Sequence, residues 1–177
     1  MVPAATRLPA LLRDGDHAPL KALIYALASL SNLMRLNQDR FATVVGVSLP
    51  QYMVLNVLED GEATVSGIAE RLHVSSQFVT LESARLVAAG LAGKKPNPLD
   101  GRSVLLTLTA TGRKRMLQAL EVRRAANDAM FHSFTASELA RLMEMVGRLL
   151  AGGREGLHAV EALSLRQERP AGRRRTS

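Results

Sequence analysis

The sequence predicts a mainly α-helical fold with one small β-hairpin. Aromatic residues make up only 3% of the chain and Trp is absent, so Ala, Leu, Val and Met must form the core, which favours packed helices. Apolar residues recur with helical spacing over most of the 177 residues. A single turn-rich segment between two short β-permissive runs interrupts this pattern, and it predicts the hairpin.

The N-terminal part is predicted to hold an arm and a long helix. Residues 1–18 are interrupted by prolines and charges, and we expect them to be disordered or extended. Residues 19–46 carry an apolar stripe with the period of an α-helix, and Gly46 ends it. The next helix begins at Ser48, because Ser48 and Gln51 form a capping-box pattern.

Residues 47–109 are predicted to form the functional domain. Two short helices, at 65–72 and 75–89, follow the capped helix and are separated by only two residues. The runs 91–95 and 103–108 then flank a tip rich in Pro, Asn, Asp and Gly, which predicts a hairpin. Three helices followed by a hairpin make a winged helix-turn-helix, whose last helix can enter the major groove of DNA.

Residues 110–165 are predicted to be helical and to serve dimerisation. Thr109 caps a helix that is expected to run to about residue 134. A second capping box opens the next helix, which is expected to end at Gly152 and Gly153. Residues 166–177 are rich in Arg and lack an apolar period, so we expect a disordered basic tail.

Positive charge is concentrated in two segments, which indicates a polyanionic partner. The net charge is +7. Residues 64–115 hold eight basic and three acidic residues, and residues 166–177 hold five and one. A basic segment that coincides with the predicted winged helix favours double-stranded DNA, although charge alone is equally compatible with a merely solvated surface.

The DNA contacts are predicted at the start of the 75–89 helix and in the hairpin. Short polar side chains there can bond to phosphates or base edges. An arginine at the hairpin tip, oriented by a neighbouring aspartate, suits the negative potential of a narrow minor groove. The candidate residues are Ser75, Ser76, Gln77, Thr80, Lys94, Lys95, Asp100 and Arg102.

This region resembles the MarR (multiple antibiotic resistance regulator) family. The resemblance rests on Ile68-Ala69-Glu70-Arg71-Leu72, Val79-Thr80, Asp100-Gly101-Arg102 and Leu106-Thr107-Leu108-Thr109 followed by Gly112. It implies a homodimer held by the terminal helices, with wings that reach the minor groove. It also implies a repressor, in many cases released from DNA by a small aromatic or acidic effector.

The chain departs from the family pattern in the helix that would read DNA. The family usually has a basic residue at the position of Leu81 and apolar residues at those of Glu82 and Ser83. We expect Leu81 to pack where the apolar residues would, and Glu82 to pair with Arg85 three residues on. The departure leaves the base-reading pattern open.

Apolar surfaces near both ends of the chain predict a homodimer, which would bind a two-fold symmetric site. One small winged helix cannot bury both the start of the first helix and a C-terminal apolar stripe. A dimer would bind a pseudo-palindromic operator with half-sites about one helical turn, roughly 10 bp, apart. The stripe consists of Leu139, Leu142, Met143, Val146, Leu149 and Leu150.

An effector pocket is predicted among methionine and aromatic side chains of the helices, although side chains in this pattern are more often plain core. Methionine adapts to either role, because its side chain is flexible. The candidate lining residues are Met34, Phe41, Tyr52, Met53 and Met116.

Other function classes find little support. The absence of Cys excludes thiolate metal sites and thiol redox sensing, and the four His lack metal-ligand spacing. No catalytic residue, metal site or cofactor is therefore predicted. No apolar run reaches the roughly 18 residues that span a bilayer, so we expect a cytoplasmic protein without a membrane partner. The alternative function, motivated by Leu81 and Glu82, is a protein-binding adaptor that kept the winged helix and lost specific DNA binding.

Overall fold

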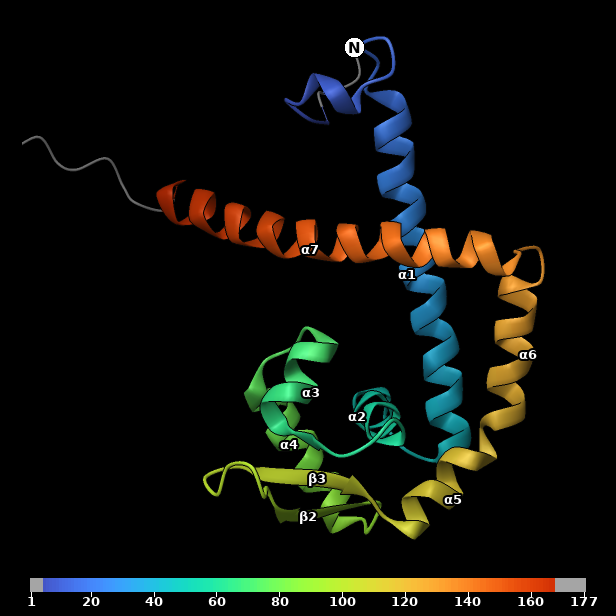
Figure 1. Ribbon diagram of the computed structural model, residues 1–177, viewed down its shortest axis with the longest axis vertical. Helices are drawn as coiled ribbons and strands as arrows, with labels where there is room; N and C mark the ends of the chain where they lie inside the picture. Colours follow the sequence, from blue (N-terminus) through green and yellow to red (C-terminus); the bar gives the residue numbers. More distant parts are fainter. Residues whose placement is uncertain (1–4, 168–177) are drawn as a thin grey trace, which may run out of the picture. The chain divides into compact units, whose positions relative to one another are not determined.

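The computed structural model describes residues 5–167, which fall into two compact units divided after Asp128. The first unit contains a long helix, a helix-turn-helix and a small sheet, and most of the second unit is one helix, α7 (Figure 1). The predicted class, mainly helical with a small antiparallel hairpin, is confirmed.

The first two helices begin and end where the local signals predict. α1 (Ala18–Val45) ends at Gly46, whose φ of 77° is a left-handed conformation that favours glycine. α2 (Leu49–Glu59) opens with the predicted capping box: Ser48 Oγ accepts the Gln51 N–H at 3.4 Å, and Gln51 Oε1 accepts the Ser48 N–H at 3.2 Å. The C-terminal part of α1 packs against α2, with the ring of Phe41 beside that of Tyr52.

The helix-turn-helix consists of α3 (Val65–Leu72) and α4 (Ser76–Ala88). His73 joins them in the left-handed conformation, with φ 54°, which histidine tolerates better than most non-glycine residues. Ser75 caps α4, because its Oγ accepts the Phe78 N–H at 3.2 Å. The sharp turn lets α4 cross α3 instead of continuing it.

The sheet has three antiparallel strands in the order β1-β3-β2. β2 (Ala92–Pro96) and β3 (Val104–Leu108) form the predicted hairpin, here called the wing together with the loop that joins them. β1 (Ala63–Thr64), which pairs Ala63 with Leu106 of β3, was not expected from the sequence. A two-residue strand is too short to show a period, and it forms here through its pairing with β3.

The core of the first unit lies where α1, α2, α3, α4 and α5 meet the sheet. Gly112, at the start of α5 (Ala110–Gln118), packs against the backbone of Leu91, where no Cβ would fit. The largest fully buried side chains are Leu55, Leu58, Ile68, Leu86, Leu106, Met116, Val45, Val54 and Val79. They come from α1, α2, α3, α4, β3 and α5, so the helix-turn-helix and the wing share one core.

The helix expected to run from Thr109 to about residue 134 is interrupted. α5 ends at Gln118, and α6 (Leu120–Phe131) begins after Ala119. Ala119 is fully buried, and its N–H bonds to the Met116 carbonyl at 3.1 Å, three residues back. We infer that the packing of Ala119 in the core causes the break between α5 and α6. No local sequence signal predicts this break.

The expected break at Gly152 and Gly153 is wrong, because α7 (Ala136–Gln167) continues through both glycines. Glycine costs about 1 kcal/mol relative to alanine inside a helix. It ends a helix most readily where it takes a left-handed conformation, and neither of these glycines has a positive φ. The second predicted capping box is present at the start of α7.

The predicted terminal segments are only partly described. Within the expected disordered or extended arm, Pro9–Leu11 form a 3-10 turn. Arg166 and Gln167, the first residues of the expected disordered tail, belong to α7, and residues 168–177 lie outside the described residues. Among residues 5–167 no single helix is long and apolar enough to cross a membrane, although α1 and α2, bent by 86°, meet that test together by length and composition.

Candidate nucleic-acid interface

The first turn of α4 and the wing border one groove, which has a volume of about 450 Å³. The start of α3 also lines the groove, and β1, which directly precedes α3, pairs with β3 of the sheet. Five of its eight lining residues carry a hydroxyl or an ammonium group, which suits phosphate oxygens. The lining residues are Thr64, Val65, Ser66, Ser76, Lys94, Ser103, Val104 and Leu106.

The predicted contact residues of α4 are exposed, but two of their hydroxyl groups already have partners. Ser75 Oγ caps the helix, and Thr80 Oγ1 donates to the Ser76 carbonyl at 2.8 Å. The side chains of Ser76 and Gln77 make no hydrogen bond to any other described residue. Among the described residues, Ser76 and Gln77 are therefore the two predicted contacts of this helix start whose side chains are fully unbonded, whereas Ser75 can still donate its proton and Thr80 can still accept one.

The expectation that Leu81 packs in the core is wrong. Leu81 is 52% exposed, whereas Glu82 and Ser83 are 4% and 2% exposed. An α-helix turns by about 100° per residue, so the buried positions Val79 and Leu86 place 82 and 83 on the inner face and 81 on the outer face. The helical period of the apolar residues of α4, applied strictly, would have predicted that Leu81 is exposed.

The predicted pair between Glu82 and Arg85 is confirmed, with 2.7 Å between Glu82 Oε1 and Arg85 Nη1. The glutamate is buried, while the arginine side chain is 56% exposed. Within the described residues, Glu82 Oε2 and Ser83 Oγ have no hydrogen-bond partner. Glu82, on the buried face of α4, thus pairs with the exposed guanidinium of Arg85. Arg85 was not among the predicted DNA contacts.

The tip of the wing is shaped by its own polar side chains. Asp100 Oδ1 accepts the Arg102 N–H at 3.0 Å, and Asn97 Nδ2 donates to Ser103 Oγ at 2.8 Å. Asp100 therefore orients the tip through the backbone of Arg102. Within residues 5–167 the Arg102 guanidinium has no ion pair or hydrogen bond, so a long cation extends from an ordered loop.

The two predicted lysines of the wing differ in their surroundings. Neighbouring residues of a strand point to opposite faces, and Lys94 lines the groove. Lys95 forms an ion pair with Glu62, which precedes β1. Only Lys94 of the two lies in the groove beside α4.

A second cavity, of about 330 Å³, lies in the first unit between α1, α2 and α6. Of the five predicted effector-pocket residues, Phe41 and Tyr52 line it. Met116 is fully buried in the core, Met34 is 42% exposed on α1, and Met53 is partly buried on α2. The lining residues are Gln38, Phe41, Tyr52, Asn56, Leu120, Arg123, Arg124 and Asn127.

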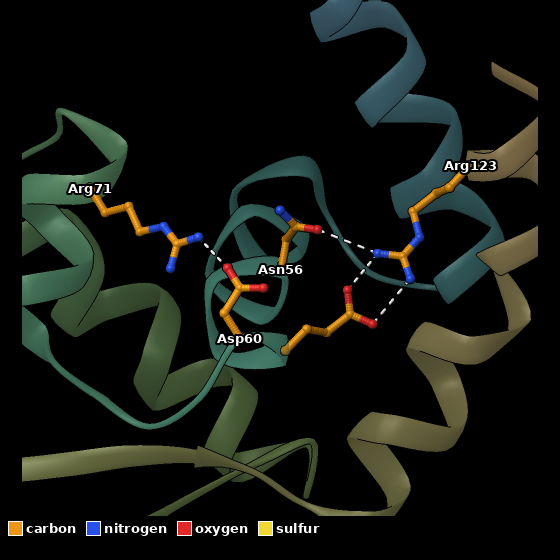
Figure 2. Close-up of polar contacts among 5 residues, drawn as sticks. Asn56, Asp60, Arg71 and Arg123 are labelled. Atoms are coloured by element: carbon orange, nitrogen blue, oxygen red, sulfur yellow. Dashed lines mark hydrogen bonds and ion pairs between the residues drawn. The ribbon is translucent and has the colours of Figure 1, made fainter. Parts of the chain in front are cut away.

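Arg123 is the most highly connected residue of this cavity. Its Nη1 lies 3.4 Å from Asn56 Oδ1 and its Nη2 lies 3.1 Å from Glu59 Oε1. Figure 2 shows Arg123 reaching toward Asn56, and also the separate pair of Arg71 with Asp60 at the end of α2. Burial raises the pKa of the Tyr52 phenol, an effect that nearby Arg123 partly opposes. Tyr52 is therefore a neutral hydroxyl in this cavity at ordinary pH.

Sequence reasoning missed most of this lining, because its members come from three helices. The rings of Phe41 and Tyr52, with centroids 6.1 Å apart, form its apolar side. Arg123 and Arg124 come from α6, and they form ion pairs with Glu59 and Glu121. No local pattern in the sequence reports that these four residues meet.

Comparison with known proteins agrees with this architecture. The sequence pattern of the MarR family matches residues 45–103. An uncharacterised protein of Mycobacterium tuberculosis is 36% identical over 101 residues, which are 57% of this chain and 70% of that protein. An HTH-type transcriptional repressor of the same species is 29% identical over 136 residues, which are 75% of this chain and 96% of the relative.

Solved structures show the same fold. A MarR family transcriptional regulator from Silicibacter pomeroyi superposes with a TM-score of 0.66 at 20% identity, covering 75% of this chain and 90% of that one. A variant of MarR from E. coli in complex with operator DNA has a TM-score of 0.54 at 25% identity, covering 72% and 95%. The predicted resemblance is thereby confirmed, and this chain belongs to the MarR family of DNA-binding transcriptional regulators.

Proposed function

We propose that the chain is a ligand-responsive repressor that binds a pseudo-palindromic operator as a homodimer. In this proposal α4 enters the major groove and the wing reaches the adjacent minor groove. The observation that carries it is the groove between the first turn of α4 and the wing, with Lys94 in its wall and, at the wing tip, the Arg102 side chain unpaired among residues 5–167. The E. coli relative solved with operator DNA and the mycobacterial relative named a repressor support it.

The homodimer is supported by apolar side chains that each unit exposes. On α1, Leu23 and Ile24 are each 50% exposed, and on α7 Met143 is 75% and Leu150 50% exposed. Large exposed apolar patches mark interaction surfaces in soluble proteins. Residues 19–46 and 110–165 would then serve dimerisation, and residues 47–109 would bind DNA.

The effector proposal rests on the cavity beside Arg123. Ligand pockets combine apolar walls with a few directed polar groups. Here the rings of Phe41 and Tyr52 face a cavity bordered by two arginines, which a small aromatic ring bearing an acidic group would engage in competition with their present glutamate partners. A panel of aromatic carboxylates should raise the melting temperature and release the protein from its operator, and Arg124→Ala should weaken both effects.

The deciding experiment is selection of genomic fragments by the purified protein, followed by footprinting on the enriched duplex. We expect protection of two half-sites about one helical turn apart and two protomers per duplex. Sedimentation that found a monomer of 19.1 kDa at micromolar concentration would contradict the dimer. Failure to enrich any duplex would contradict operator binding and leave the adaptor function as the better explanation.

A further inference from the structure

The face of α4 that points away from the core is poor in hydrogen-bonding groups. Its buried stripe contains Val79 and Leu86, so a turn of about 100° per residue places another set of residues on the opposite line. All members of that line are exposed. They are Gln77, Leu81, Ala84 and Ala88.

The polar residues beside this line do not change its character. The Thr80 hydroxyl donates its proton to the Ser76 carbonyl, and the Ser75 hydroxyl serves as the helix cap. Beyond Gln77, the outermost groups of α4 are therefore methyl groups, with Arg85 at the edge of the line. Single exposed leucines are ordinary on protein surfaces, but Leu81 lies on the helix that borders the wing groove.

We propose that Leu81 determines operator specificity by contacting the 5-methyl group of a thymine in the major groove. This inference rests on the operator binding proposed above. Among the unmodified base pairs, the thymine methyl is the one apolar group in the major groove. The small side chains of Ala84 and Ala88 allow the helix backbone to approach the base edges closely, and Leu81 reaches beyond them.

Other occupants of the Leu81 surface fit the structure less well. A partner protein would be expected to cover a broad apolar patch, whereas Leu81 is flanked along its line by Gln77 and by alanines. Arg85, exposed on α4 although paired with Glu82, and Lys94, in the groove beside the first turn of α4, suit the phosphates that border a thymine in duplex DNA. The leucine would then read the base while the cations hold the backbone.

The test uses deoxyuridine, which differs from thymine only by the missing methyl group. Each thymine of the selected operator is replaced in turn, symmetrically in both half-sites, and affinity is measured by fluorescence anisotropy. Burial of one methyl group corresponds to about a fourfold change in affinity. Replacement at the contacted position should therefore weaken binding of the unmodified protein about fifteenfold, because the effects in the two half-sites multiply.

The Leu81→Ala variant should bind the thymine operator about as weakly as the unmodified protein binds the deoxyuridine operator. Replacement of that thymine should then change the affinity of Leu81→Ala less than about twofold. Leu117→Ala, which removes a leucine that is 61% exposed on α5, is the matched control and should keep the full thymine preference. Leu81→Gln provides a second variant in case the alanine variant alters α4, and it should lose the same preference.

Equal effects of deoxyuridine on the unmodified protein and on Leu81→Ala at every position would overturn the inference while leaving operator binding intact. Insensitivity of the unmodified protein to every replacement would overturn it as well. If no duplex were enriched in the first place, the proposed function would fail together with it, so the two failures are distinguishable.

Discussion

Replacement of Glu82 by leucine should stabilise the protein, although it removes an ion pair. Glu82 is 4% exposed, and one of its oxygens lies 2.7 Å from Arg85 Nη1. Its other oxygen, Oε2, is buried without a partner among the described residues. The sign of the effect depends on whether burying the unpartnered oxygen costs more free energy than the ion pair contributes.

The cost of burying the unpartnered oxygen should exceed the stabilisation that the ion pair provides. A buried polar group without a hydrogen bond costs about 1–3 kcal/mol, whereas a pair with a half-exposed arginine contributes about 0–1 kcal/mol. Leucine is similar in size to glutamate and adds apolar burial, as in other replacements of buried ion pairs. The free energy of unfolding should rise by about 1–2 kcal/mol, which corresponds to roughly 2–8 °C in Tm for a chain of this length.

Thermal unfolding followed by circular dichroism, at one protein concentration, measures this shift. Glu70→Leu, at an exposed position of α3, is the matched control and should stay within about 0.5 kcal/mol of the unmodified protein. A Tm for Glu82→Leu that falls by several degrees would refute the reasoning, because it would mean that the carboxylate makes interactions worth more than its burial costs.

Three further substitutions test other parts of the structure. Arg102→Ala should weaken operator binding by about 1–3 kcal/mol and lower the slope of log affinity against log salt by about one unit. Tm should stay unchanged, because the guanidinium has no partner among the described residues. Unchanged binding in an anisotropy salt series would argue against wing contact. Glu62→Gln should tighten binding a few-fold at low salt, since it frees Lys95 for phosphate contact, and looser binding in the same assay would count against this role. Gly112→Ala should lower the free energy of unfolding by at least about 2 kcal/mol in urea denaturation, because its Cβ would lie 2.1 Å from the Leu91 carbonyl oxygen; a neutral result would mean that the backbone shifts at little cost.

Local chemistry in the chain was enough to predict most elements of the winged helix. The capping box at Ser48 and the hydroxyl cap at Thr109 act within three residues along the chain, so they can be recognised without knowing the fold. The tip of the wing is equally local, because Asp100 binds the backbone two residues on. The candidate DNA contacts at the start of α4 and in the wing were named for the same reason.

Features that depend on distant partners were decided by tertiary structure. β1 forms through its pairing with β3, the junction at Ala119 depends on burial in the core, and the cavity beside Arg123 is assembled from three helices. The orientation of α4 likewise puts Leu81 outside and Glu82 inside, against the pattern that their polarity suggests. The burial of Glu82 costs free energy that the apolar packing of the same helix face offsets, and only the packed structure shows which side of the helix that face is.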